Sequence, residues 1–263
     1  METRQPAVAG TFYPADRQRL QTDLKQLLDH ATASDISPEA IKALIVPHAG
    51  YVYSGPVAAT AYRLLQTRHD QIRRVVLLGP SHRVPLNGMA IPTVDCFRTP
   101  LGDIALDGAA LQAVGNLPEV VQRDDAHERE HSLEVHLPFL QAVLDDFTLT
   151  PIVVGNASPG SVVRVLETLW GGDDTLLVIS SDLSHFLPYE QARRQDAETT
   201  RLIEAKQGRI VGDQACGCYP LNGLLQLAAG RGLTVRTLDV RTSGDTAGSR
   251  DQVVGYGSYA VCQ

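Results

Sequence analysis

Three short, uninterrupted apolar segments constrain the fold of this chain more than any other feature of its sequence. They span residues 43–46, 75–78 and 176–180, and a Pro, a Gly or a polar residue follows each one. Continuous apolar segments of this length are typical of strands that are covered on both faces. Segments with helical spacing lie between them, which predicts an α/β fold with a central mixed, mostly parallel sheet and helices on both faces.

The clearest helix is expected over residues 16–30, where Leu20, Leu24, Leu27 and Leu28 recur at helical spacing. A second helix is expected to open at Ser54-Gly55-Pro56. Further helices are expected over residues 131–144, 161–170, 188–205 and 219–229, and Pro138 is expected to be able to kink the first of these or shift its start. Further strands are expected over residues 149–154, 235–240 and 254–261, with a hairpin or an edge strand within residues 89–106.

The length and charge of the chain exclude several classes of protein. A chain of 263 residues can bury a full core, and we expect one domain over residues 1–263. A net charge of -7 argues against binding to nucleic acid or to an anionic membrane. No apolar run approaches the roughly 20 residues of a membrane span, and the first residues lack the pattern of a signal peptide. Four cysteines in a chain this long do not suggest a disulfide framework, so a reduced, cytoplasmic protein is expected.

Each of the three apolar strands leads into a histidine. His48 follows the first strand, His82 follows the second, and His185 follows the third. In an open α/β sheet, ligands bind beyond the carboxyl ends of the strands, where these imidazoles are expected to meet. A single histidine at such a place is more often a loop cap or a satisfied core group. Three in matching positions favour a metal-dependent or histidine-dependent enzyme.

A competing motif is His127-Glu128-Arg129-Glu130-His131, which matches the H-E-x-x-H pattern of zinc peptidases. That mechanism requires all five residues on one helix with a third ligand nearby. A pattern with two free positions is weak evidence by itself, so the zinc peptidase is a remote alternative. In the simpler interpretation His127 is exposed and only His131 points inward.

Six ordered motifs resemble the Memo family, whose bacterial and archaeal members are called AmmeMemoRadiSam protein B. The resemblance covers nearly the whole chain. The Memo family is similar in fold to class III extradiol dioxygenases, which use non-haem Fe(II) and O₂. The motifs are PHAGYVYSG (47–55), LLGPSH (77–82), FRTPLG (97–102), EHSLEVHLPFLQ (130–141), SSDLSH (180–185) and DQVVGYGSYA (251–260).

This resemblance implies a role for each candidate residue. His48 and His82 fall on the two histidine ligands of the dioxygenases, and Cys216 matches the Memo cysteine beside the metal. His185 falls on the acid/base histidine. The residues that would assist proton transfer are His131, a second pocket histidine, and Asp182, an added carboxylate.

The thiol of Cys216 stands where the dioxygenases have a carboxylate. A thiolate makes the site softer and gives it affinity for Cu(I) and Zn(II) as well as Fe(II). It is also oxidisable, which suits repeated O₂ activation poorly. If Cys216 is instead a small buried apolar residue, it has no part in the site.

The leading hypothesis is a non-haem metal protein, with iron first and copper or zinc as alternatives. It would carry out redox chemistry on a small aromatic or planar polar substrate. The rival is a non-catalytic protein that binds metal or a partner peptide. The family name also implies a functional link to a radical-SAM protein.

Overall fold

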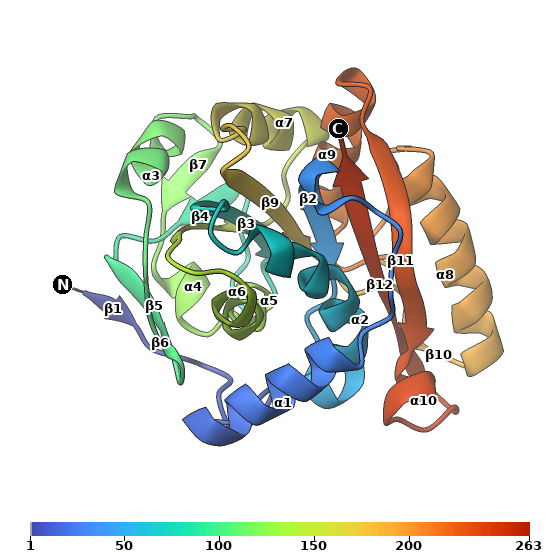
Figure 1. Cartoon of the computed structure of the whole chain (residues 1–263). Coiled ribbons are helices and arrows are strands. Elements are labelled where there is room, and N and C mark those ends of the chain that lie inside the picture. Colours follow the sequence, from blue (N-terminus) through green and yellow to red (C-terminus); the bar gives the residue numbers. More distant parts are fainter. Residues whose placement is uncertain (1) are drawn as a thin grey trace.

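A nine-stranded mixed sheet runs through the centre of the molecule, with helices on both of its faces (Figure 1). The structure is a computed structural model, and it describes residues 2–263. The strands of this sheet are β2 (Ile41–Val46), β3 (Arg74–Pro80), β4 (Met89–Ile91), β7 (Val120–Gln122), β8 (Thr148–Val154), β9 (Thr175–Ser180), β10 (His185–Leu187), β11 (Thr234–Thr242) and β12 (Val253–Cys262).

The strand order is β10-β12-β2-β9-β3-β8-β4-β7, and β11 pairs with β12. The four central strands β2, β9, β3 and β8 are parallel to one another, whereas β12 and β4 run antiparallel to their central neighbours. This arrangement confirms the predicted α/β fold with a mixed sheet whose centre is parallel.

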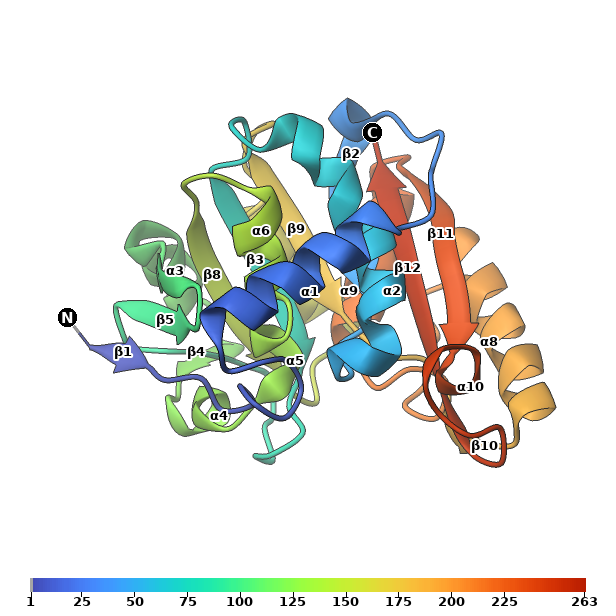
Figure 2. The same cartoon turned by 60° about the horizontal axis from the view of Figure 1, so that its bottom comes forward.

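The helices divide between the two faces. Those of at least seven residues are α1 (Arg17–Asp29), α2 (Tyr51–Arg63), α3 (Gly108–Gly115), α6 (Leu137–Val143), α7 (Pro159–Thr168), α8 (Tyr189–Glu204) and α9 (Cys218–Gly230). Helices α1, α2 and α6 cover one face, and α3, α7 and α9 cover the other (Figure 2). Helix α8 packs along β11 and β12. No helix within residues 2–263 is long and apolar enough to cross a membrane.

Each central strand sends alternate side chains into the two cores, because successive residues of a strand point to opposite faces. In β2, Leu44 and Val46 join the core beneath α1, α2 and α6. Ala43 and Ile45 join the core beneath α7 and α9. The uninterrupted apolar segments in the sequence are therefore strands buried on both sides.

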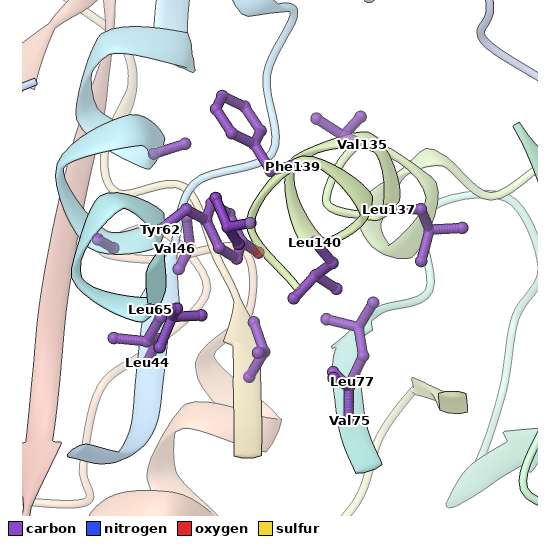
Figure 3. Packing of buried hydrophobic residues seen from close by; sticks show 14 of the residues in the cluster. Leu44, Val46, Tyr62, Leu65, Val75, Leu77, Val135, Leu137, Phe139 and Leu140 are labelled. Carbon is purple, nitrogen blue, oxygen red and sulfur yellow. The ribbon is translucent and has the colours of Figure 1, made fainter. Parts of the chain in front are cut away.

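The core beneath α2 and α6 is built around aromatic side chains (Figure 3). The rings of Tyr62 and Phe139 stack with centroids 5.2 Å apart, and Leu65 and Leu140 are also fully buried. The Tyr62 hydroxyl is a polar group within this apolar surrounding, so it needs a hydrogen-bond partner.

Two predicted helices differ from those observed. Helix α2 begins at Tyr51 rather than near Ser54, and Pro56 lies inside it. The Tyr51 N–H, which has no partner within the helix, donates to the Phe12 carbonyl at 2.8 Å. The helix expected over residues 131–144 is broken into α5 (His131–Glu134) and α6. Pro138 explains the break, because its ring clashes with the carbonyl four residues earlier, that of Glu134.

A small second sheet lies beside the main one. It consists of β1 (Thr3–Arg4), β5 (Cys96–Thr99) and β6 (Gly102–Ala105), and β5 and β6 form the expected hairpin. The remaining short elements are the helices α4 (Asp125–Glu128) and α10 (Ser243–Thr246) and the 3-10 turns Pro38–Ala40 and Leu64–Arg68.

Candidate metal centre

Three adjacent central strands end at one edge of the sheet, and polar residues follow each of them. His48 lies two residues beyond β2, and His82 lies two residues beyond β3. Between them, β9 runs into Ser181 and Asp182. The carboxyl ends of parallel strands lie at the same edge of a sheet, so these residues are brought together there. Helix α5 lies near this edge (Figure 2).

His48, His82 and His131 form a compact group in which one ligand atom from each residue lies within 4.8 Å of the others. The ring centroids are 5.2 Å apart for His48 and His82, and 4.7 Å apart for the stacked pair His82 and His131. His48 is buried and His131 is half-buried, whereas 29% of the His82 side chain is exposed. The group therefore opens to solvent on the His82 side. Imidazoles so arranged suit iron, copper or zinc.

His48 is held by the hydroxyl of Ser180, the last residue of β9. Its Nδ1 lies 2.6 Å from Ser180 Oγ, and that hydroxyl donates its one proton to the Ser132 carbonyl at 2.6 Å. Because Ser180 Oγ can then only accept, His48 Nδ1 carries a hydrogen and donates it. The Nε2 atom of His48 therefore carries no hydrogen, which is the form of imidazole that binds a metal.

A second buried histidine, His136, extends this hydrogen-bonded chain. Its Nε2 donates to the same Ser180 Oγ at 2.8 Å, and the Tyr62 hydroxyl donates to its Nδ1 at 2.8 Å. Burial lowers the pKa of His136 to about 3, so the ring is neutral, as these bonds require. Each of these nitrogens and hydroxyls has a partner, and a fully satisfied buried network fixes its members in place.

His82 is held by a carboxylate instead. Its Nδ1 donates to Glu130 Oε1 at 2.9 Å, and its backbone N–H donates to Glu130 Oε2 at 2.6 Å. A carboxylate that accepts from the far nitrogen of an imidazole orients the ring and strengthens it as a metal ligand. The Nε2 atom of His82 is thereby left free.

Glu130 also caps the short helix α5. Its Oε1 accepts the backbone N–H groups of His131 at 3.0 Å and of Ser132 at 2.9 Å. Burial opposes ionisation of this carboxyl. The hydrogen bonds from His82 and from the backbone prevail, however, and hold its pKa at about 2. One carboxylate thus connects His82 to the helix that carries His131.

The His131 ring is held by contacts with neighbouring rings and by Glu130, whose Oε1 lies 3.4 Å from His131 Nδ1. Its ring lies between those of His82 and Phe12, with a centroid distance of 4.9 Å to Phe12. Its Nδ1 is buried and has no hydrogen-bond partner. Burial lowers the pKa of His131 to about 4, so the ring is neutral near pH 7 and offers lone-pair nitrogen to a metal ion. An orphaned nitrogen within this group fits a centre completed by a metal.

The N-terminal segment that carries Phe12 is tied to α5 by Glu134. This buried carboxylate forms an ion pair with Arg4 and accepts the backbone N–H of Val8 at 2.9 Å and the hydroxyl of Tyr13 at 2.6 Å. Burial raises the pKa of Tyr13, so its hydroxyl remains a donor. The segment therefore forms a fixed wall of the site beside His131.

Cys216 lies against His48 but outside the group of three histidines. Its Sγ is 3.3 Å from His48 Nε2, and it accepts the backbone N–H of Asp182 at 3.3 Å. Burial raises the pKa of this thiol well above its usual range, so without a metal it is protonated and donates to His48 Nε2. The family resemblance gives Cys216 the third ligand position and His131 a proton-transfer role. The geometry places His131 among the ligand atoms, with Cys216 adjacent.

Asp182 supports the backbone at the end of β2. Its Oδ1 accepts the N–H of His48 at 2.7 Å, and burial raises its pKa to about 7. The predicted role of Asp182 as a proton partner therefore rests on a carboxyl group that also positions His48.

His185 begins β10, at the edge where His48 and His82 lie, and it is half-buried. Burial lowers its pKa, and the hydrogen bond of the ring with Leu183 opposes this. His185 lies close enough to His48 and His82 to affect their electrostatics, but it is not part of the group of three.

The HEREH segment does not form a zinc peptidase site. His127 and His131 lie on separate short helices, α4 and α5, and Glu128 is exposed. The expectation that His127 is exposed is wrong, because it is 2% exposed and its Nε2 donates to the Ala90 carbonyl at 3.0 Å. Burial lowers its pKa to about 4. The chemistry of this segment lies in Glu130 and His131.

Four supporting residues escaped the sequence reasoning: Glu130, Ser180, His136 and Tyr62. Three of them lie within motifs that the resemblance quotes, at 130–141 and 180–185. A polar residue inside an otherwise apolar segment was the available signal. Ser180 closes the apolar strand β9, and His136 interrupts the apolar part of its motif.

The chain is similar to Memo family proteins along nearly its whole length. The family model described as Memo-like protein matches residues 4–260. MEMO1 family proteins of Aquifex aeolicus and Aeropyrum pernix are each 35% identical to the chain. The first alignment covers 97% of the chain and 98% of that relative, and the second covers 99% and 100%. Among solved structures, an uncharacterized Escherichia coli K12 protein, JW3007, matches with a TM-score of 0.51 and 13% identity. That match covers 82% of the chain and 99% of JW3007, and it shows a shared fold.

Proposed function

The chain belongs to the Memo-like protein family, and we propose from this membership and from its site that it is a non-haem metal protein. In this proposal it carries out redox chemistry on a small aromatic or planar polar substrate. The observation that carries the proposal is the group of three histidine ligand atoms within 4.8 Å of one another.

His48 and His82 are oriented for metal binding by hydrogen bonds that do not depend on a metal. Ser180 and Glu130 occupy the Nδ1 atoms of His48 and His82, so both rings present Nε2 to the site. Such outer hydrogen bonds fix the tautomer and the orientation of a ligand. His131 and Cys216 are the candidates for the third ligand.

Fe(II) is the first choice of metal, with copper or zinc as alternatives. Bound there, it would supply one-electron chemistry and a position for oxygen. Of the four residues around this centre, only Cys216 offers a sulfur, which shifts the preference towards softer metals when it binds.

The remaining site residues would move protons. His185 is half-buried, and burial keeps its pKa below the usual value, so it is neutral at pH 7 and able to accept a proton. Asp182, whose pKa burial raises to about 7, holds a proton part of the time at that pH. In the rival hypothesis the same pocket binds a metal or a partner peptide without turnover.

Metal content and oxygen uptake test the proposal together. We expect the anaerobically loaded protein to bind one Fe(II), and His48→Ala or His82→Ala to lower the metal affinity by more than about 100-fold, since changes around the ligands alone cost 10–100-fold. His185→Ala should keep the metal but abolish oxygen uptake with a panel of phenols. His131→Ala and Cys216→Ala, compared by X-ray absorption, identify the third ligand.

Three outcomes would change the assignment. Loss of metal from His185→Ala would make His185 a ligand and end its role as a base. Metal binding without oxygen uptake by any phenol would favour the non-catalytic alternative. Full metal retention by His48→Ala and His82→Ala would remove the proposed centre.

A further inference from the structure

Phe186, the residue after His185, combines high exposure with an unfavourable backbone conformation. It is 67% exposed and has a φ of 57°. A left-handed conformation is costly for a residue with a bulky side chain, whereas glycine adopts it freely. Among the residues that the structure describes, Lys206 is the other non-glycine with a positive φ, and it follows the end of α8, where this conformation is common.

The backbone at Phe186 belongs to a β-bulge. His185 pairs with Val254 and Leu187 pairs with Val253, so two steps along β10 match a single step along β12. Phe186 is the extra residue, at a position where a left-handed bulge usually has glycine. The bulge places the Phe186 ring edge-on to the ring of His185, with centroids 5.8 Å apart.

Several exposed apolar side chains lie near site residues in the sequence. The described residues include seven large hydrophobic side chains with high exposure. Five of them are Val52 and Tyr53 after His48, Phe186 after His185, and Val211 and Tyr219 on either side of Cys216. The other two, Val121 and Val240, lie on the edge strands β7 and β11. Apolar side chains that are exposed next to polar site residues favour a binding role for those residues.

We propose that Phe186 is a ligand-contacting residue whose ring stacks on the flat face of an aromatic ligand bound at the metal site. Strain held at an exposed position beside a site indicates function, because a glycine there would relieve it. The neighbouring His185 supplies a polar partner, so the pair fits a ring that bears a hydroxyl or similar group. This inference rests on the proposed function and names the ligand class of the same site.

The test compares a flat aromatic chelator with a small aliphatic one. Dissociation constants for 4-nitrocatechol and for oxalate are measured on the anaerobic Fe(II) protein. We expect Phe186→Gly to weaken 4-nitrocatechol binding by about 3- to 10-fold, as expected for the loss of one aromatic pair. Oxalate binding should not change, and the melting temperature should equal or exceed that of the wild type. Phe186→Tyr, which keeps the ring, should bind both ligands as the wild type does.

Lys206→Gly is the matched control for a left-handed residue away from the site. Its Nζ donates to the Leu233 carbonyl, next to the first residue of β11 and therefore at the opposite end of the sheet. This variant should leave both dissociation constants unchanged.

The outcomes separate this inference from the metal proposal. Unchanged 4-nitrocatechol binding by Phe186→Gly would overturn it. So would equal losses for both ligands with a lower melting temperature, because Phe186 would then be structural. The dissociation constants of 4-nitrocatechol for the wild type and for Phe186→Gly are also compared on metal-free protein. Failure to bind metal therefore does not decide the role of Phe186.

Discussion

The two histidines that follow β2 and β3 are supported in different ways. His48 is buried, and a neutral chain through Ser180, His136 and Tyr62 holds it. His82 lies at the exposed side of the site, and the ionised Glu130 holds it. Both arrangements leave Nε2 without a hydrogen, so a neutral support and a charged support prepare the two imidazoles in the same way for a metal.

The difference follows from burial. A charge beside His48, inside the core, would cost free energy unless it were fully paired, so neutral hydroxyl and imidazole groups suit that position. Glu130 lies where several N–H groups converge, and their hydrogen bonds compensate for its burial. The charged support should therefore depend on pH and contribute more to metal affinity than the neutral one.

The largest effect is expected on the stability of the metal-free protein and on its dependence on pH. The pKa of Glu130 is about 2 in the folded state and 4.5 for an ordinary glutamate, so its ionised form stabilises the fold above pH 4.5. That stabilisation is lost as the pH falls towards 2. Glu130→Gln should therefore lower the free energy of unfolding by about 3 kcal/mol at pH 7, and the difference from the wild type should shrink below pH 4.5.

Urea unfolding at a series of pH values measures this difference. Glu128→Gln, an exposed neighbour on α4, is the matched control and should follow the wild type. A Glu130→Gln deficit that stays constant down to pH 3 would mean that the carboxylate stabilises the fold by packing rather than by charge.

The second-largest effect is expected on metal affinity, which should differ between variants of Glu130 and of Ser180. We expect Glu130→Gln to lower it by about 100-fold and Ser180→Ala by about 10-fold, the two ends of the range for outer groups, because a carboxylate strengthens an imidazole ligand more than a hydroxyl does. Competition with a chromophoric chelator at pH 7 gives both values. Equal losses would show that orientation, rather than charge, is what both supports provide.

The smallest effect is expected at the far end of the neutral chain. Tyr62→Phe leaves His136 Nδ1 buried without a donor, which should cost about 1–2 kcal/mol of stability. The metal affinity should fall less than tenfold, since Ser180 still accepts from His48. Thermal and urea unfolding measure the stability change, and Tyr53→Phe, an exposed tyrosine of the same helix, is the control. If Tyr62→Phe lowers the free energy of metal binding more than the free energy of unfolding, the hydrogen-bonded chain from Tyr62 orients His48.

The sequence by itself determined the sheet and the place of the site. Apolar runs over 43–46, 75–78 and 176–180 predicted buried parallel strands, and the residues after them predicted where polar groups would meet. This succeeds because the alternation of a strand and the crevice beyond parallel strands depend on local pattern.

Only the tertiary structure decided which groups hold the histidines. The expected helix over 131–144 is broken at Val135–His136. His136 then contacts Ser180, and His131 on α5 stacks on His82. A separate break at Arg129–Glu130, between α4 and α5, divides HEREH, which the pattern alone allowed to be one helix. Hydrogen bonds between Glu130 and His82, or between Ser180 and His136, join residues more than 40 positions apart. Such partners depend on how whole helices and strands pack together, and local periodicity does not encode that packing.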